Sequence, residues 1–288
     1  MKKQIERVIP KPARPGMVGD GFRVYNFIPS TVLQRRISPF LMLDFGAEFN
    51  FGPSDHVRGV DVHPHKGFET VTIAYKGSVA HHDSTGNSGV INPGDVQWMT
   101  AGAGILHKEY HEKEFSKRGG PFEMVQLWVN LPKKDKSTPA HYQAITADKM
   151  GKIELPDNGG VVNVIAGNFN KVKGPAYTYS PVNLFDIKLK KGAEVTVSVP
   201  AEHNTAILMV NGTAVIDDKP VAEHSFVLFK NDGDEITIKA EADAVILLMS
   251  GEPIDEPIAS YGPFVMNTQE EIYEAIEEFQ AGKYGVLE

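Results

Sequence analysis

The sequence contains no cysteine, which removes disulfides, thiolate metal ligands and cysteine nucleophiles together. It also has no strong basic cluster: the densest group is Lys133, Lys134 and Lys136, which we expect in a solvated loop. With a net charge of -8, this argues against direct binding to nucleic acid. No apolar run is long enough to span a bilayer, and no signal-peptide segment follows Met1. We therefore expect a cytoplasmic protein without membrane or nucleic-acid partners.

Helix signals are also scarce, whereas β-branched runs bounded by Gly, Pro, Asn and Asp recur along the whole chain. Many short strands separated by such turns predict an all-β sandwich or barrel architecture. The clearest runs are Thr70–Tyr75, Val125–Val129, Val161–Ile165, Val195–Val199, Ala206–Val210, Phe226–Phe229 and Ala244–Met249.

One helix is predicted near the end of the chain, at about residues 269–281. Thr268 and Glu271 have the spacing of a capping box, and Gly282 is a stop signal. Apolar residues from Ile272 to Phe279 recur at helical spacing. We expect this helix to dock on the body of the protein.

The length of 288 residues is enough for two domains, each with its own core. Lys, Asp, Ser, Thr and Pro concentrate between Pro132 and Pro139, a composition typical of a linker. We expect one domain at residues 1–135 and a second, which includes the helix, at 136–288.

Two pairs of candidate metal ligands carry most of the chemical information. His63 and His65 are two residues apart, as are His107 and Glu109. On an extended strand, such a spacing directs both side chains to one face. Two adjacent strands would therefore present three imidazoles and one carboxylate to a single ion. Glu69 follows His65 by four residues and competes with Glu109 for the carboxylate position, and spacing alone does not separate them.

Imidazole and carboxylate donors together suit Fe, Mn, Co, Ni, Cu or Zn. In an octahedral site, four protein ligands would leave two positions for a bidentate oxygen substrate, or for substrate and dioxygen. We therefore predict a metal-dependent protein of the cupin type, with dioxygenase chemistry.

The second half of the chain echoes the first without its ligands. A strand that ends at Gly77 is followed by a Pro-Gly-Asp turn, and one that ends at Gly212 is followed by Asp232-Gly233-Asp234. When Gly77 and Gly212 are aligned, His63 and His65 fall opposite Ser198 and Pro200. The second domain is therefore expected to lack the metal.

At the ligand pairs, the sequence resembles the pirin family. The similarity covers nearly the whole chain. Its motifs are His63–Thr72, Asp83–Gly89, Pro93–Gly102 and Gly104–Glu109 in the first half, and Gly251–Pro253, Tyr261–Thr268 and Gly282–Gly285 in the second.

The resemblance implies two tandem cupin barrels, of the double-stranded β-helix or jelly-roll type, with a short C-terminal helix. It implies metal ligation by His63, His65, His107 and Glu109, which favours Glu109 over Glu69. Pirins usually hold iron, so Fe(II) is the expected metal, with Mn, Co, Ni, Cu and Zn as alternatives.

The resemblance also implies an activity: oxidation of quercetin-like flavonols with dioxygen, in which the flavonol ring opens and carbon monoxide is released. Glu109 is the expected catalytic base. Other family members regulate through protein partners, so an iron-binding regulatory protein without turnover is the alternative. A sugar isomerase of the cupin type is a weaker third reading.

Further residues are candidates for contacts around the metal or for the substrate pocket. Each also has a plain structural reading, as core packing or as an ordinary polar residue. Glu69, His56 and His111 are candidate partners of the ligands, and Phe51, Phe68, Trp98 and Trp128 are candidate walls of an apolar pocket.

Overall fold

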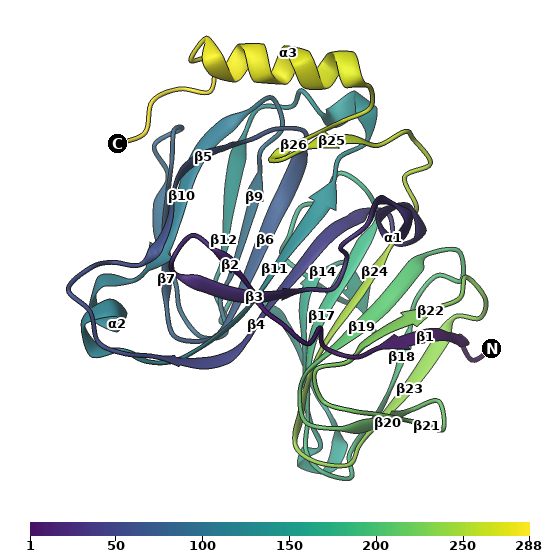
Figure 1. Cartoon of the computed structure of the whole chain (residues 1–288). Coiled ribbons are helices and arrows are strands. Elements are labelled where there is room, and N and C mark those ends of the chain that lie inside the picture. Colours follow the sequence, from purple (N-terminus) through teal and green to yellow (C-terminus); the bar gives the residue numbers. More distant parts are fainter. The chain divides into compact units, whose positions relative to one another are not determined.

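The predicted β-branched runs form antiparallel strands throughout the computed structural model, which describes residues 1–288 (Figure 1). Each of the seven runs named above lies in a strand, with at most one residue outside it, and several of these strands extend beyond the run: β11 (Gly120–Asn130) starts five residues before Val125, and β6 (Phe68–Lys76) starts two residues before Thr70. The strands form two separate units, each with a large and a small antiparallel sheet. The all-β prediction is confirmed.

The N-terminal unit comprises Arg14–Arg35, Phe40–Ala147 and Ile254–Glu288. Its large sheet has the order β12-β9-β6-β11-β4-β3-β2, and its small sheet has the order β5-β10-β7-β8. The strands of these sheets are β2 (Gly16–Val18), β3 (Phe22–Asn26), β4 (Phe40–Phe51), β5 (Gly59–His65), β6 (Phe68–Lys76), β7 (Val79–Asp83), β8 (Ser88–Ile91), β9 (Val96–Thr100), β10 (Ile105–His111), β11 (Gly120–Asn130) and β12 (His141–Ile145).

The C-terminal unit comprises Met1–Ala13, Arg36–Pro39 and Asp148–Pro253. Its large sheet has the order β1-β22-β19-β24-β17-β14-β13, and its small sheet has the order β18-β23-β20-β21. The strands of these sheets are β1 (Ile5–Ile9), β13 (Gly151–Glu154), β14 (Gly160–Ala166), β17 (Val182–Leu189), β18 (Glu194–Ser198), β19 (Asn204–Asn211), β20 (Ala214–Ile216), β21 (Lys219–Val221), β22 (Phe226–Phe229), β23 (Glu235–Ala240) and β24 (Ala244–Gly251).

The remaining elements are short, apart from the C-terminal helix. None of the helices has the length and apolar character needed to cross a membrane. These elements are α1 (Thr31–Arg36), α2 (Lys113–Arg118), α3 (Gln269–Gln280), the 3-10 turns η1 (Lys133–Asp135) and η2 (Pro156–Asn158), and the hairpins β15 (Asn168–Phe169) with β16 (Val172–Lys173) and β25 (Ala259–Tyr261) with β26 (Phe264–Met266).

The predicted C-terminal helix is present as α3, with the expected capping box between Thr268 and Glu271. Its buried face packs with Phe264 and Met266 of β26, so the helix belongs to the N-terminal unit. Figure 1 shows it in yellow, across one end of that unit.

The units do not follow the simple division expected at residue 135. Strand β12 pairs with β9 of the N-terminal unit, whereas β1, from the start of the chain, pairs with β22 of the C-terminal unit. Local composition does not encode these long-range pairings, which is why the sequence boundary was misplaced.

The expectation of a solvated loop at the lysine cluster also fails at one position. Lys136 is 2% exposed, and its ammonium donates to the Gly67 and Val265 carbonyls and to Asn130 Oδ1 at 2.8 to 3.0 Å. Three acceptors therefore accommodate the amine inside the fold, where burial lowers the pKa of Lys136 to about 7.

Candidate metal centre

The predicted ligand pairs lie on adjacent antiparallel strands of the small N-terminal sheet. His63 and His65 are on β5, and His107 and Glu109 are on β10. His63 is directly opposite His107 in the register of the two strands. The alternation of side chains along each strand then directs all four toward the interior of the barrel.

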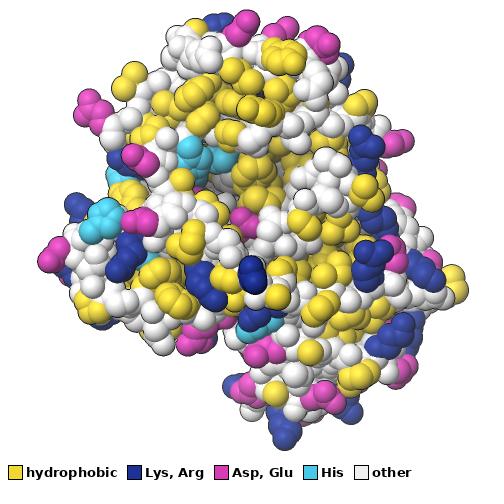
Figure 2. All heavy atoms as spheres, viewed as in Figure 1, with side chains coloured by type: hydrophobic (Ala, Val, Ile, Leu, Met, Phe, Trp, Pro, Cys, Tyr) yellow, Lys and Arg dark blue, Asp and Glu magenta, His cyan; other side chains and the backbone are white.

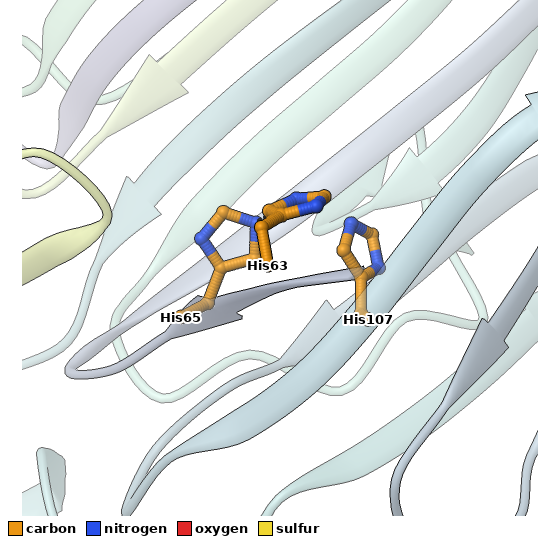
Figure 3. A group of neighbouring side chains, drawn as sticks. All are labelled: His63, His65 and His107. Atoms are coloured by element: carbon orange, nitrogen blue, oxygen red, sulfur yellow. Dashed lines mark hydrogen bonds between the residues drawn. The ribbon is translucent and has the colours of Figure 1, made fainter. Parts of the chain in front are cut away.

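The three histidines converge on one point, as the prediction required (Figure 3). One ring nitrogen from each lies within 4.8 Å of the others, and the Nε2 atoms of His63 and His65 are 3.1 Å apart. His65 and His107 are buried, and His63 is partly exposed. On the face shown in Figure 2, histidine atoms are visible beside a depression bordered by hydrophobic side chains.

Glu109 lies next to this cluster, with its Oε2 atom 3.5 Å from Nε2 of His107. The carboxylate accepts hydrogen bonds from Gln126 Nε2 at 2.7 Å and from Thr72 Oγ1 at 3.2 Å. Both donors come from the large sheet, on β11 and β6. Glu109 is therefore held by both sheets of the barrel.

The surroundings favour neutral imidazoles at His63 and His65 and an ionised carboxylate at Glu109. Burial, followed by the charge of His107, lowers the pKa of His63, and burial lowers the pKa of His65 well below its usual range. Burial opposes ionisation of Glu109, but the electrostatic interaction with His107 and the hydrogen bond from Gln126 outweigh it and lower the pKa of Glu109 to about 2. Neutral imidazole and ionised carboxylate are the forms that bind metals.

The donor set fits a divalent transition metal. The Nδ1 atom of His63 donates to the Asp61 carbonyl at 2.7 Å, which leaves the Nε2 lone pair directed at the cluster. His107 is 0% exposed, and neither of its ring nitrogens has a hydrogen-bond partner. Buried nitrogens without partners are costly in a protein interior, and a shared cation removes that cost.

Two of the predicted pocket residues border the histidines. The ring of Phe68 lies 5.1 Å from that of His65, and the ring of Trp128 lies 5.5 Å from it. The two aromatic rings also contact each other, at 4.2 Å. They form an apolar wall beside the candidate ligands.

Phe51 lies elsewhere in the barrel. Its ring packs 4.6 Å from His111, which is four residues along β10 from His107. His111 itself donates to the Gly21 carbonyl at 2.8 Å and packs among phenylalanines. Both residues belong to an aromatic core and do not border the histidine cluster.

Glu69 and Trp98 lie on the opposite face of the large sheet from Thr72. On β6, Glu69 and Val71 point to one face of the sheet, and Trp98 of β9 is paired with Val71 and shares that face. Thr72 points to the other face, where it contacts Glu109. Glu69 accepts a hydrogen bond from Thr100 Oγ1 at 2.7 Å. The expected proximity of Glu69 to the ligands assumed one continuous strand, but β5 ends at His65 and β6 starts at Phe68.

His56 is exposed and lies outside the cluster. It pairs with Asp20 at 2.7 Å and lines a separate pocket of about 400 Å³ with Lys108 and Tyr110. Because strand positions alternate, these two residues face away from His107 and Glu109. No contact links His56 to the candidate ligands.

Sequence reasoning did not single out Gln126, Thr72 or His81 as part of the site. Gln126 and Trp128 are two residues apart on β11, so their side chains lie on the same face of the sheet. A polar residue on the same face as a candidate pocket residue could have been recognised from the sequence. His81 is directly opposite Glu109 in the pairing of β7 and β10, and it stacks on Tyr142 at 4.5 Å. It is 1% exposed, and burial lowers its pKa to about 4.

The ends of both ligand-bearing strands are fixed by the C-terminal segment. Lys66, directly after His65, donates its backbone N–H to the Pro263 carbonyl and accepts from the Val265 N–H. Its ammonium bonds Glu278 of α3 at 2.6 Å. On the other side, a Cβ at Gly104 would lie 2.2 Å from the ring of Tyr284. Residues remote in sequence thus support the site.

The barrel architecture and the converging histidines together define a bicupin with a candidate metal centre in its N-terminal barrel. Family models agree: Pirin matches residues 21–129, and the Pirin C-terminal cupin domain matches residues 184–285. The chain belongs to the pirin family.

Relatives match along almost the full length. A Pseudomonas aeruginosa protein with the provisional name quercetin 2,3-dioxygenase is 48% identical, over 93% of each chain. Pirin-like protein 2 of Arabidopsis thaliana is 40% identical, over 93% of this chain and 81% of its own. A crystal structure named quercetin 2,3-dioxygenase, from Acinetobacter baumannii, has 47% identity, a TM-score of 0.95 and full coverage of both chains.

Proposed function

We propose that the protein is a metal-dependent dioxygenase that opens the ring of quercetin-like flavonols with dioxygen and releases carbon monoxide. The observation that carries this proposal is the convergence of His63, His65 and His107 beside Glu109. The names of the two quercetin dioxygenase relatives support the same reaction.

In this proposal His63, His65, His107 and Glu109 hold a divalent metal, and Fe(II) is the metal we expect from the family. When bound, the metal would act as a Lewis acid toward a substrate hydroxyl and dioxygen. Mn, Co, Ni, Cu and Zn suit the same nitrogen and oxygen donors.

Glu109 is the proposed base for the substrate hydroxyl proton. Its low pKa keeps the carboxylate ionised but also makes it a weak base, so the role requires a bound metal that lowers the pKa of the substrate hydroxyl. Gln126 and Thr72 fix the orientation of the carboxylate. Trp128 is partly exposed beside His65, and the buried ring of Phe68 packs against it, so the exposed part of Trp128 suits contact with an aromatic substrate.

The test is aerobic incubation of the Fe(II)-loaded protein with quercetin, with flavonol absorbance and carbon monoxide both followed. We expect turnover that His63→Ala abolishes, and slower turnover in Glu109→Gln. Undiminished turnover in Glu109→Gln would refute the base role. Absence of turnover with intact metal binding would refute the dioxygenase and favour the regulatory alternative.

A further inference from the structure

The carboxylate of Glu109 differs from the three histidines in how it is held. The histidine rings are carried by β5 and β10 alone, whereas Glu109 is also bonded across the barrel to the large sheet. The shorter of these bonds, 2.7 Å, comes from the side-chain amide of Gln126.

The geometry fixes the direction of this bond. An ionised carboxylate only accepts hydrogen bonds, so the amide must present its N–H₂ group to Oε2 of Glu109. The same nitrogen lies 3.4 Å from Thr72 Oγ1, and Thr72 donates to the other carboxylate oxygen. Both oxygens of Glu109 therefore have a donor from the large sheet.

Gln126 and Thr72 are directly opposite each other in the pairing of β11 and β6. Their backbone positions are fixed by the sheet, so the two donors form a rigid support for a flexible glutamate side chain. A glutamate loses considerable rotamer freedom when it is fixed, and a preformed support removes that cost from metal binding.

We propose that Gln126 is a positioning residue that orients Glu109 for metal binding. The inference rests on the proposed metal site and assigns to Gln126 no contact with the metal. It gives Gln126 a measurable role that acts only through Glu109.

The barrel also contains a matched control for this role. Gln97 lies on β9, directly opposite Thr72, and is 0% exposed. Its amide has no hydrogen-bond partner and makes no bond to Glu109. Gln97 thus shares residue type and sheet face with Gln126, is more deeply buried, and lacks the contact with the carboxylate.

The test is calorimetric titration of the metal-free full-length protein with Ni²⁺, which needs no activity and does not oxidise in air. Gln126→Met keeps the length of the side chain but removes the donor, and we expect Ni²⁺ to bind about tenfold more weakly. Gln97→Met should change the affinity by less than about twofold. Circular dichroism and thermal melting check that each variant is folded.

A double-mutant cycle then separates positioning from a general structural effect. In a Glu109→Ala background no carboxylate remains to be oriented, so Gln126→Met should have almost no further effect on Ni²⁺ affinity. Equal losses in both backgrounds, or wild-type affinity in Gln126→Met, would overturn the inference. If the proposed metal site itself is wrong, the outcome is different: wild type and His107→Ile would then bind Ni²⁺ with the same affinity.

Discussion

The two barrels place chemically opposite residues at equivalent interior positions. Counting from the turn glycines Gly77 and Gly212 makes His81 equivalent to Ile216. Strand pairing extends the match: Glu109 lies opposite His81, and Ile238 lies opposite Ile216.

The same register covers the whole candidate site. Seven polar residues at or beside the candidate site have aliphatic counterparts that belong to the buried core of the C-terminal barrel. The pairs are His63 and Val197, His65 and Val199, His107 and Ile236, Glu109 and Ile238, Thr72 and Ile207, Gln126 and Leu248, and Gln97 and Val227.

The two barrels share a strand arrangement but differ in the polarity of their interiors. The C-terminal barrel fills its interior with Val, Ile and Leu and gains stability from their burial. The N-terminal barrel has polar side chains in its interior, and several of their buried polar atoms have no hydrogen-bond partner. A bound metal would provide a partner for the histidine nitrogens among them. The proposed metal site therefore belongs to the first barrel, and the equivalent interior of the second consists of packed aliphatic side chains.

This register also corrects the sequence alignment. His63 corresponds to Val197 and not to Ser198, because Ile207 follows Val197 by ten positions, whereas Thr72 follows His63 by nine. The expectation that the second barrel lacks the ligands is unchanged. The three-histidine cluster has no counterpart there, since the equivalent positions are apolar.

The largest effect is expected when a polar residue is moved into the apolar barrel. Ile238→Glu places a carboxylate in the C-terminal core without the donors that surround Glu109, and we expect a loss of about 4 kcal/mol or more in the free energy of unfolding. Urea denaturation measures it. A loss below about 1 kcal/mol would show that this interior tolerates polar groups, contrary to the comparison.

The opposite exchange replaces a candidate metal ligand with an apolar residue. His107→Ile introduces the residue of the C-terminal barrel, and we expect Ni²⁺ affinity to fall by at least about 100-fold, beyond the usual effect of residues that only support a ligand. His56→Ala, at an exposed histidine of the same unit, is the control. Equal Ni²⁺ binding by the two variants would contradict the assignment of His107.

A paired exchange sharpens the comparison further. In metal-free protein, Glu109→Ile leaves the donors of the partly buried Gln126 and the buried Thr72 without their acceptor, at a cost of about 1 to 3 kcal/mol. Adding Gln126→Leu should recover part of that loss, because the second replacement removes one unpaired donor. Urea denaturation of the two single variants and the double variant tests this, and strictly additive losses would contradict it.

The smallest predicted effect concerns pH. Burial raises the pKa of Glu69 to about 7, so the folded protein binds a proton there that the unfolded chain releases above its ordinary pKa. The free energy of unfolding should therefore decrease by about 1 to 2 kcal/mol as pH rises from about 5 to 7. Glu69→Gln should reduce this dependence of the free energy of unfolding on pH. An unchanged dependence would show that other titrating groups cause it.

Sequence spacing predicted the ligand pairs because strand alternation is local and His63, His65, His107 and Glu109 each lie within a strand. It did not separate Glu109 from Glu69, because the break between β5 and β6 resets the parity and is not visible in the residues themselves. The choice of Glu109 came from family resemblance.

The aromatic candidates show the same limit. Trp128 lies beside His65, whereas Trp98 lies on the other face of the large sheet, and both are tryptophans in strand-rich sequence. Which face of a strand borders the site depends on pairing with distant strands. The positions of β1 and β12 depend on such pairing too, and composition does not contain it.

The central claim is that the N-terminal barrel binds a divalent metal and the C-terminal barrel does not. Anomalous diffraction from crystals of the Ni²⁺-loaded protein tests it most directly. We predict one strong peak at bonding distance, about 2.0 to 2.3 Å, from nitrogens of His63, His65 and His107 and from a carboxylate oxygen of Glu109. A peak at histidines of the C-terminal barrel, or none among these four residues, would contradict the account.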